Sequence, residues 1–166
     1  MRNIVGSVVR GDDFFERPKT IKKLWQAIDN GEHILLSAPR RSGRTSLLRH
    51  LCENPKENFS LVYVDVSSVD RRNSFYERCL NAISFKSTQT PDNYIKEFIH
   101  ALQTIKNKQQ LIFIIDEFPQ AILNIHRARD RTNTIQFLLR LRDIRQNPAF
   151  NHIQFIFTDS PSLRTL

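Results

Sequence analysis

The segment SAPRRSGRTS, residues 37–46, has the residue types of a loop that binds phosphate groups. Such loops commonly read G-x-x-x-x-G-K-[ST], because phosphate oxygens need a ring of backbone N–H groups at the start of a helix, together with one cation. Here Ala38 stands at the first glycine position, Gly43 keeps the second, Arg44 replaces the lysine and Thr45 keeps the hydroxyl. Two of the four characteristic residues match, so the segment predicts a phosphate site in which arginine supplies the cation.

A second polar motif, Asp116-Glu117, closes the most apolar run of the chain, residues 111–115. In a fold that hydrolyses nucleotides, Asp116 would bind Mg²⁺ together with Thr45, and Glu117 would polarise the attacking water. The alternative interpretation is an acidic cap for the next helix, since carboxylates are favourable near a helix N-terminus. The phosphate-loop pattern on the same chain favours the catalytic interpretation.

The segments around these motifs alternate between short apolar runs and helical periodicity. The apolar runs cover residues 33–37, 61–66, 111–115 and 153–157. Helical spacing of apolar residues separates them, as in Ile21, Leu24, Trp25 and Ile28, which precede Asn30-Gly31. Strands that are apolar throughout and separated by helices are typical of parallel strands buried on both faces. The pattern predicts an α/β fold, a three-layer sandwich with a parallel sheet of about four strands flanked by helices.

Composition narrows the class of protein. The 166 residues are 40% hydrophobic and 10% aromatic, which indicates one globular domain and excludes disorder. Cys52 and Cys79 have no metal-binding spacing, the five histidines are scattered, and we interpret all seven as structural. No apolar run approaches the ~18 residues of a membrane span, so we expect a cytoplasmic protein. The net charge of +8 indicates an acidic partner or simply a solvated basic surface.

Together, four segments resemble the AAA-type ATP-binding proteins of bacteria and archaea. They are FFERP at residues 14–18, the helix that ends at Gly31, the loop APRRSGRTS and the strand IFIIDEFP at residues 112–119. The combination is similar to origin-recognition initiators and to multidomain signal-transducing ATPases, and it covers roughly residues 13–160. The resemblance implies a P-loop NTPase fold, with ATP and Mg²⁺ as cofactors.

The resemblance also implies roles for individual residues. Phe15 and Arg17 would lie beside the adenine, or alternatively would staple and cap the first helix. Thr158 or Ser160 would sense the γ-phosphate, although Asp159 stands where the family usually has glycine. The expected nucleotide-binding loop comprises Pro39, Arg40, Arg41, Ser42, Gly43, Arg44, Thr45 and Ser46. Arg44 and Glu117 would be the catalytic residues, and Arg142 or Arg145 would reach the nucleotide of a neighbouring subunit.

The domain organisation expected from the resemblance is a flexible arm at residues 1–12 and an ATPase core at residues 13–166. Such folds carry a fifth strand and a helical lid after the fourth strand, and this sequence ends before them. We therefore expect the first strand to lie at an open sheet edge. The chain is then either a truncated or degenerate ATPase module, or a module completed by self-association or by a partner protein, because exposed edges are normally covered.

Two functions follow as hypotheses. The first is an ATP-binding switch with slow or absent hydrolysis, because arginine replaces a compact ammonium with a larger planar group. The alternative is a basic nucleic-acid-binding module in which the phosphate loop is a relic. This alternative depends on the net charge and on two arginine groups. We expect Arg127, Arg129 and Arg131 in a loop, and Arg140, Arg142 and Arg145 along one helix.

Overall fold

The computed structural model describes residues 17–39, 42–85, 94–105, 109–129 and 131–159. The predicted arm at residues 1–12, Phe15, Arg40, Arg41 and Ser160 lie outside these ranges. Within them, no helix has both the length and the apolar composition needed to cross a membrane.

Four parallel strands form one sheet in the order β1-β4-β3-β2. The strands are β1 (Ile34–Ser37), β2 (Phe59–Asp65), β3 (Gln110–Asp116) and β4 (Ile153–Asp159). The central strands β3 and β4 are buried along almost their whole length, as their apolar sequences predict. Because all four strands run the same way, their carboxyl ends meet at one edge of the sheet.

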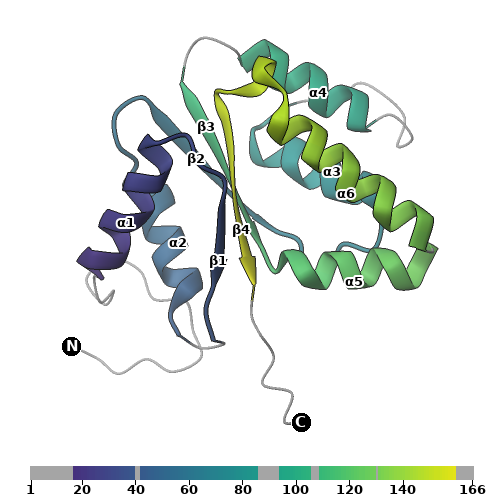
Figure 1. Ribbon diagram of the computed structural model, residues 1–166, viewed down its shortest axis with the longest axis horizontal. Coiled ribbons are helices and arrows are strands. Elements are labelled where there is room, and N and C mark those ends of the chain that lie inside the picture. The colour runs from purple at the N-terminus through teal and green to yellow at the C-terminus, as the bar shows by residue number, and fades with distance from the viewer. Residues whose placement is uncertain (1–16, 40–41, 86–93, 106–108, 130, 160–166) are drawn as a thin grey trace.

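One face of the sheet is covered by α1 (Pro18–Asp29) and α2 (Arg44–Glu53), as Figure 1 shows. Helix α1 begins with a proline at its first turn and ends before Gly31, whose φ of +75° a glycine adopts without strain. The strand residue Gln154 holds this helix in place, since its buried side-chain amide donates to the carbonyls of Ile28 (3.0 Å) and Glu32 (3.1 Å).

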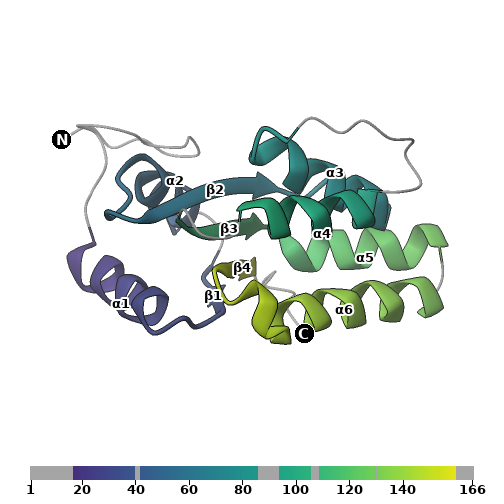
Figure 2. The same cartoon turned by 90° about the horizontal axis from the view of Figure 1, so that it is seen from above.

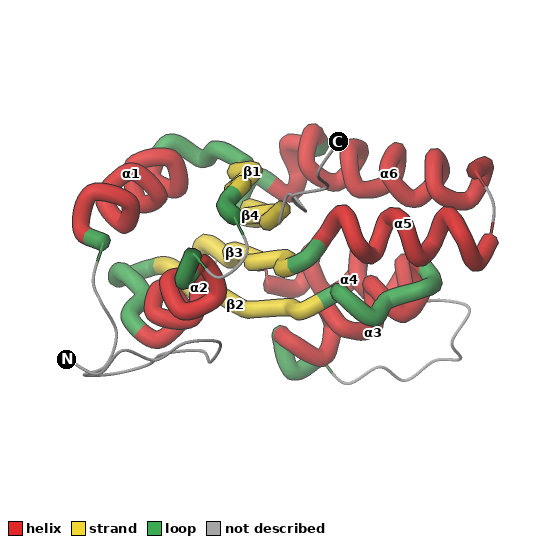
Figure 3. The backbone as a smooth tube through the Cα atoms, turned by 90° about the horizontal axis from the view of Figure 1, so that it is seen from below, coloured by secondary structure: helices red, strands yellow, loops and turns green. Residues whose placement is uncertain are grey.

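The other face carries four helices, seen on the opposite side of the sheet in Figure 2. They are α3 (Arg72–Ala82), α4 (Tyr94–Ile105), α5 (Phe118–Arg129) and α6 (Arg131–Gln146), and the short 3₁₀ helix η3 (Pro148–Phe150) leads into β4. Aromatic rings dominate this layer, with Phe75, Tyr76 and Phe137 in mutual edge contact. The predicted three-layer α/β sandwich is therefore confirmed (Figure 3).

One expectation was wrong: Arg127 and Arg129 lie in helix α5, and Arg131 begins helix α6. The predicted loop does not extend over these residues. Helix α5 buries few apolar side chains, among them Ala121 and Ile125. The helical periodicity of its apolar residues is therefore weak in the sequence. The helix itself begins at Phe118, two residues after the end of β3.

Candidate phosphate-binding site

The loop after β1 leads into an uncapped helix N-terminus. Gly43 precedes α2 with a φ of +79°, a left-handed conformation that strains any residue with a Cβ. No side chain caps this end, and its first turn contains no acidic residue. A helix start of this kind presents backbone N–H groups and a positive dipole end, which suit an anion.

Arg44, the first residue of α2, does not extend into solvent; only 7% of it is exposed. Its Nη2 donates to Asp116 Oδ1 (3.1 Å) and Glu117 Oε1 (2.9 Å), and its Nη1 donates to the carbonyl oxygen of Asp159 (2.5 Å). The guanidinium therefore ties the start of α2 to the ends of β3 and β4. The two motifs that the sequence placed 72 positions apart meet at this point.

Asp116 lies at the centre of the cluster and is 3% exposed. Its Oδ1 accepts from Arg44, from the Thr158 hydroxyl and from the Glu117 N–H (3.1 Å). Its Oδ2 accepts from the Thr45 hydroxyl (3.4 Å) and from the Tyr63 hydroxyl. Five donors thus reach one carboxylate. Donors from α2, β2 and β4 are among them, and they stabilise its negative charge.

The sequence analysis assigned no functional role to Tyr63 and missed its place in this cluster. Parallel pairing aligns Tyr63 with Ile114 and Asp65 with Asp116, which brings the Tyr63 ring beside the end of β3. The Arg49 guanidinium lies 3.7 Å from the centre of the Tyr63 ring. Burial, and then the hydrogen bond to Asp116, raises the pKa of Tyr63, so its hydroxyl stays a donor at neutral pH. Alignment of the two predicted strand ends was the signal that could have found it.

Glu117 has a φ of +60°, a conformation that is strained for a residue other than glycine. Its backbone N–H donates to Thr158 Oγ1 (3.2 Å), and its carbonyl accepts from Gln120 (3.1 Å) at the start of α5. The backbone of Glu117 therefore begins the helix, while its carboxylate turns toward Arg44. Strained residues of this kind cluster at functional sites.

Arg17 reaches the loop from the other side. Its guanidinium donates to the carbonyl of Ser42, and a Cβ added to Gly43 would lie 3.1 Å from Arg17 Nη2. Arg17 is the N-cap residue of α1, but its side chain makes no capping hydrogen bond. The side chain of Arg17 thus lies at the loop before α2, and its predicted position beside an adenine stays a prediction.

Other predicted residues lie around the cluster in different ways. Ser46 is buried, Pro39 is exposed, and Thr158 is fully buried behind Asp116. Arg142 and Arg145 are exposed on α6, where Arg145 lies 5.9 Å from the centre of the Phe157 ring. The predicted contact of either arginine with a neighbouring subunit stays a prediction.

Two buried polar atoms in the loop have no hydrogen-bond partner among the described residues, Ser42 Oγ and Arg44 Nε. Buried donors without a partner are costly and call for an explanation. Both atoms belong to residues at the N-terminus of α2, where an anion is favourable. The residues present therefore fit a nucleotide phosphate.

The same residues fit Mg²⁺ poorly. A carboxylate offers about four lone-pair sites, and N–H and O–H donors already use those of Asp116. A guanidinium between Asp116 and Glu117 also repels a second cation. Within the described ranges, no group of three or more His, Cys, Asp or Glu side chains is placed to hold a metal ion. The Mg²⁺ assignment of Thr45 and Asp116 therefore stays a prediction with which this geometry disagrees.

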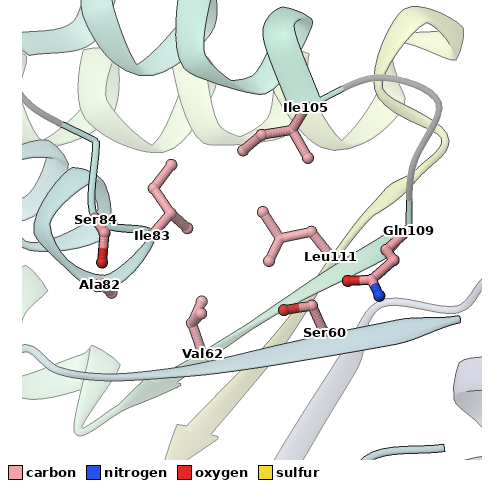
Figure 4. Close-up of a pocket in the computed structure, with 8 residues that line it drawn as sticks. All are labelled: Ser60, Val62, Ala82, Ile83, Ser84, Ile105, Gln109 and Leu111. Carbon is pink, nitrogen blue, oxygen red and sulfur yellow. The ribbon is translucent and has the colours of Figure 1, made fainter. Parts of the chain in front are cut away.

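A separate cavity of about 300 Å³ lies near the amino ends of β2 and β3, away from the phosphate loop (Figure 4). Apolar and uncharged polar residues line it, including Val62, Ile83 and Leu111. None of the described residues that line this cavity is a cation, and none of them belongs to the predicted nucleotide-binding loop.

Comparison with known proteins agrees with the geometry. A family model described as AAA domain matches residues 28–166. No curated protein matches the chain. Among solved structures, the chain is similar to the Aeropyrum pernix ORC2 protein in its ADPNP-ADP complexes, with 14% identity and a TM-score of 0.58 over 86% of this chain and 40% of that one.

Two further structures are similar. For Drosophila ORC bound to DNA, the identity is 10% and the TM-score 0.59, over 88% of this chain and 38% of that one. For Cdc6p from Pyrobaculum aerophilum, the identity is 13% and the TM-score 0.55, over 93% of this chain and 41% of that one. The chain thus spans about 40% of the length of these proteins. With the family match over most of its residues, the chain belongs to the AAA domain family of P-loop ATP-binding proteins.

Proposed function

We propose that this chain is a nucleotide-binding switch domain that takes ATP and ADP and hydrolyses ATP slowly or not at all. The observation that carries the proposal is Arg44, which is buried at the start of α2 and whose Nε has no hydrogen-bond partner among the described residues. The Aeropyrum pernix relative, whose structure contains ADPNP and ADP, supports adenine nucleotides as the ligands.

The contacts of Glu117 support slow hydrolysis. A general base must be free to accept a proton from the attacking water. Here the Glu117 carboxylate accepts from Arg44 at 2.9 Å, and that ion pair holds it against the loop. Arg44 itself has both terminal nitrogens bound to the strand ends, which restricts its movement toward a transferring phosphate.

Calorimetric titration of the purified chain with ATP and with ADP tests the proposal. We expect micromolar binding of both, and phosphate release close to the rate without protein. Arg44→Ala should weaken binding at least about tenfold, since it removes the buried cation, whereas the exposed Arg140→Ala should leave it unchanged. A folded wild-type chain that releases no heat with either nucleotide would refute the proposal.

A second candidate function is DNA binding, which the basic surface favours. The chain carries a net charge of +8, and Arg140, Arg142 and Arg145 are exposed on α6. One of the similar structures is Drosophila ORC bound to DNA. Affinity for a short duplex should fall steeply with salt, and the double variant Arg140→Ala with Arg142→Ala should flatten this dependence. The double variant Lys22→Ala with Lys23→Ala, exposed on α1, is the charge-matched control.

A further inference from the structure

Arg44 lies where a divalent cation would have to stand in order to neutralise the two acidic residues of the site. Its Nη2 is 3.1 Å from Asp116 Oδ1 and 2.9 Å from Glu117 Oε1. The side chain is 7% exposed and that of Asp116 is 5% exposed, so water screens this contact little. This guanidinium therefore already offsets one of the two carboxylate charges that an anionic ligand would otherwise meet directly.

The remaining ligand positions of Asp116 are also taken. Thr45, Tyr63 and Thr158 donate hydroxyl hydrogens to it, and the Glu117 N–H donates to Oδ1. A metal ion could bind this carboxylate only after several of these buried donors lost their acceptor, and a buried donor without a partner is costly. The hydroxyl of Thr45, the other predicted metal ligand, is one of those donors.

Arg44 can hold the carboxylates and still serve an anion. Its Nη1 and Nη2 make the contacts with β3 and β4, while its Nε has no partner among the described residues. Arg17 adds a second guanidinium beside the loop, at the carbonyl of Ser42. The site thus contains two organic cations at the helix N-terminus where a phosphate would bind.

We propose that Arg44 is the built-in cation of this site, and that the chain binds nucleoside phosphates without requiring a divalent metal ion. The proposal rests on the proposed nucleotide-binding function and names the cation that accompanies the phosphates in that site. Arg44 acts here as a binding and positioning residue: it offsets one of the two negative charges of Asp116 and Glu117, which would otherwise repel the phosphates more strongly.

The test compares ATP binding by the wild-type chain in excess Mg²⁺ and in EDTA, measured by calorimetry. We expect the two dissociation constants to agree within about threefold. Arg44→Lys should introduce a metal requirement, because a compact ammonium cannot bridge both carboxylates and the Asp159 carbonyl as the planar guanidinium does. For this variant we expect binding about tenfold weaker in EDTA than in Mg²⁺. Arg140→Lys, exposed on α6, is the matched control.

Each outcome separates the two proposals. Wild-type binding that is lost or weakened more than about threefold in EDTA would overturn the role of Arg44, while the nucleotide function would stand. Absence of binding in both conditions would overturn the nucleotide function itself. If Arg44→Lys fails to fold, which its thermal unfolding would reveal, the wild-type comparison still decides the proposal.

Discussion

At the scale of single residues, the site depends on one buried ion pair. Arg44 and Asp116 are almost fully enclosed, and removing one partner of such a pair leaves the other charge buried without compensation. The pair therefore matters for folding as well as for the proposed nucleotide binding. This is a consequence of burial, since a similar contact at the surface contributes little.

We expect Asp116→Asn to lower the free energy of unfolding by about 3 kcal/mol, because Arg44 would keep only part of its compensation. Asp29→Asn is the matched control, since it breaks the Asp29–Lys56 contact of 2.8 Å, in which both side chains are 46% exposed. For that variant the free energy of unfolding should decrease by less than about 1 kcal/mol. Urea unfolding of the three proteins measures both changes, and equal losses would show that the Arg44 cluster does not stabilise the fold.

At the scale of elements, the start of α2 depends on a glycine that adopts a left-handed conformation. We expect Gly43→Ala to cost about 1–2 kcal/mol of stability, because a Cβ strains this conformation. The added methyl group would also press against Arg17 Nη2 at 3.1 Å and displace it from the loop. ATP affinity should therefore fall together with stability.

Gly31→Ala separates these two effects. Its φ of +75° carries the same strain, but nothing lies within 4 Å of the added Cβ. Urea unfolding should show a similar decrease in the free energy of unfolding for both variants, while calorimetry should show weaker ATP binding for Gly43→Ala alone. Weaker binding in both variants would argue against a specific contact between the loop and Arg17.

His33 joins three elements just before β1. Its Nδ1 accepts from the backbone N–H of Phe155 in β4 (3.1 Å), and its Nε2 lies 3.3 Å from the carbonyl oxygen of Arg145 in α6. Burial lowers the pKa of His33; the hydrogen bond with the Arg145 carbonyl acts against this, and the Arg145 charge lowers the pKa further. The folded chain therefore favours the neutral ring, whose Nδ1 remains an acceptor.

A folded-state pKa below the unfolded value means that the unfolded chain binds the proton more readily. The contribution of His33 is thus fully present above about pH 6.5 and is lost as the pH falls through the lower folded-state value. We expect the free energy of unfolding, measured in urea, to decrease over this window in the wild type. His33→Gln should reduce that decrease; an unchanged pH dependence would exclude His33 as its source.

At the scale of the whole molecule, β1 forms one edge of the four-stranded sheet. Leu35 on this strand is 70% exposed, an unusual value for leucine in a strand. We propose that self-association or a partner protein covers this edge, because open edges with apolar side chains tend to pair with other chains.

Leu35→Lys tests the self-association version. The free energy of unfolding should change by less than about 0.5 kcal/mol, because the side chain is already in solvent. Sedimentation velocity should show less association than for the wild type, since a lysine on an edge strand opposes pairing. Leu123→Lys, on α5 and 45% exposed, should leave association unchanged. Equal association in all three proteins would exclude the β1 edge as the contact.

Much of the fold was predictable from the sequence because burial leaves a periodic signature. Strands β3 and β4 are buried on both faces, so their residues are almost all apolar and easy to recognise. Helix α5 was not predicted as far as Arg127 and Arg129, because few of its side chains enter the core and its apolar residues therefore show little helical periodicity. Periodicity detects only those elements that bury a regular stripe.

The sequence by itself determined the parallel α/β class, the phosphate loop and the acidic end of β3, because each depends on residues that are near neighbours in the chain. Tertiary structure alone decided that Arg44 turns onto Asp116 and Glu117, that Tyr63 joins them from β2, and that Arg17 lies on the loop. These contacts join segments that lie 25 to 73 positions apart. They exist because parallel strands bring their carboxyl ends to one edge, where side chains from separate elements share a small volume.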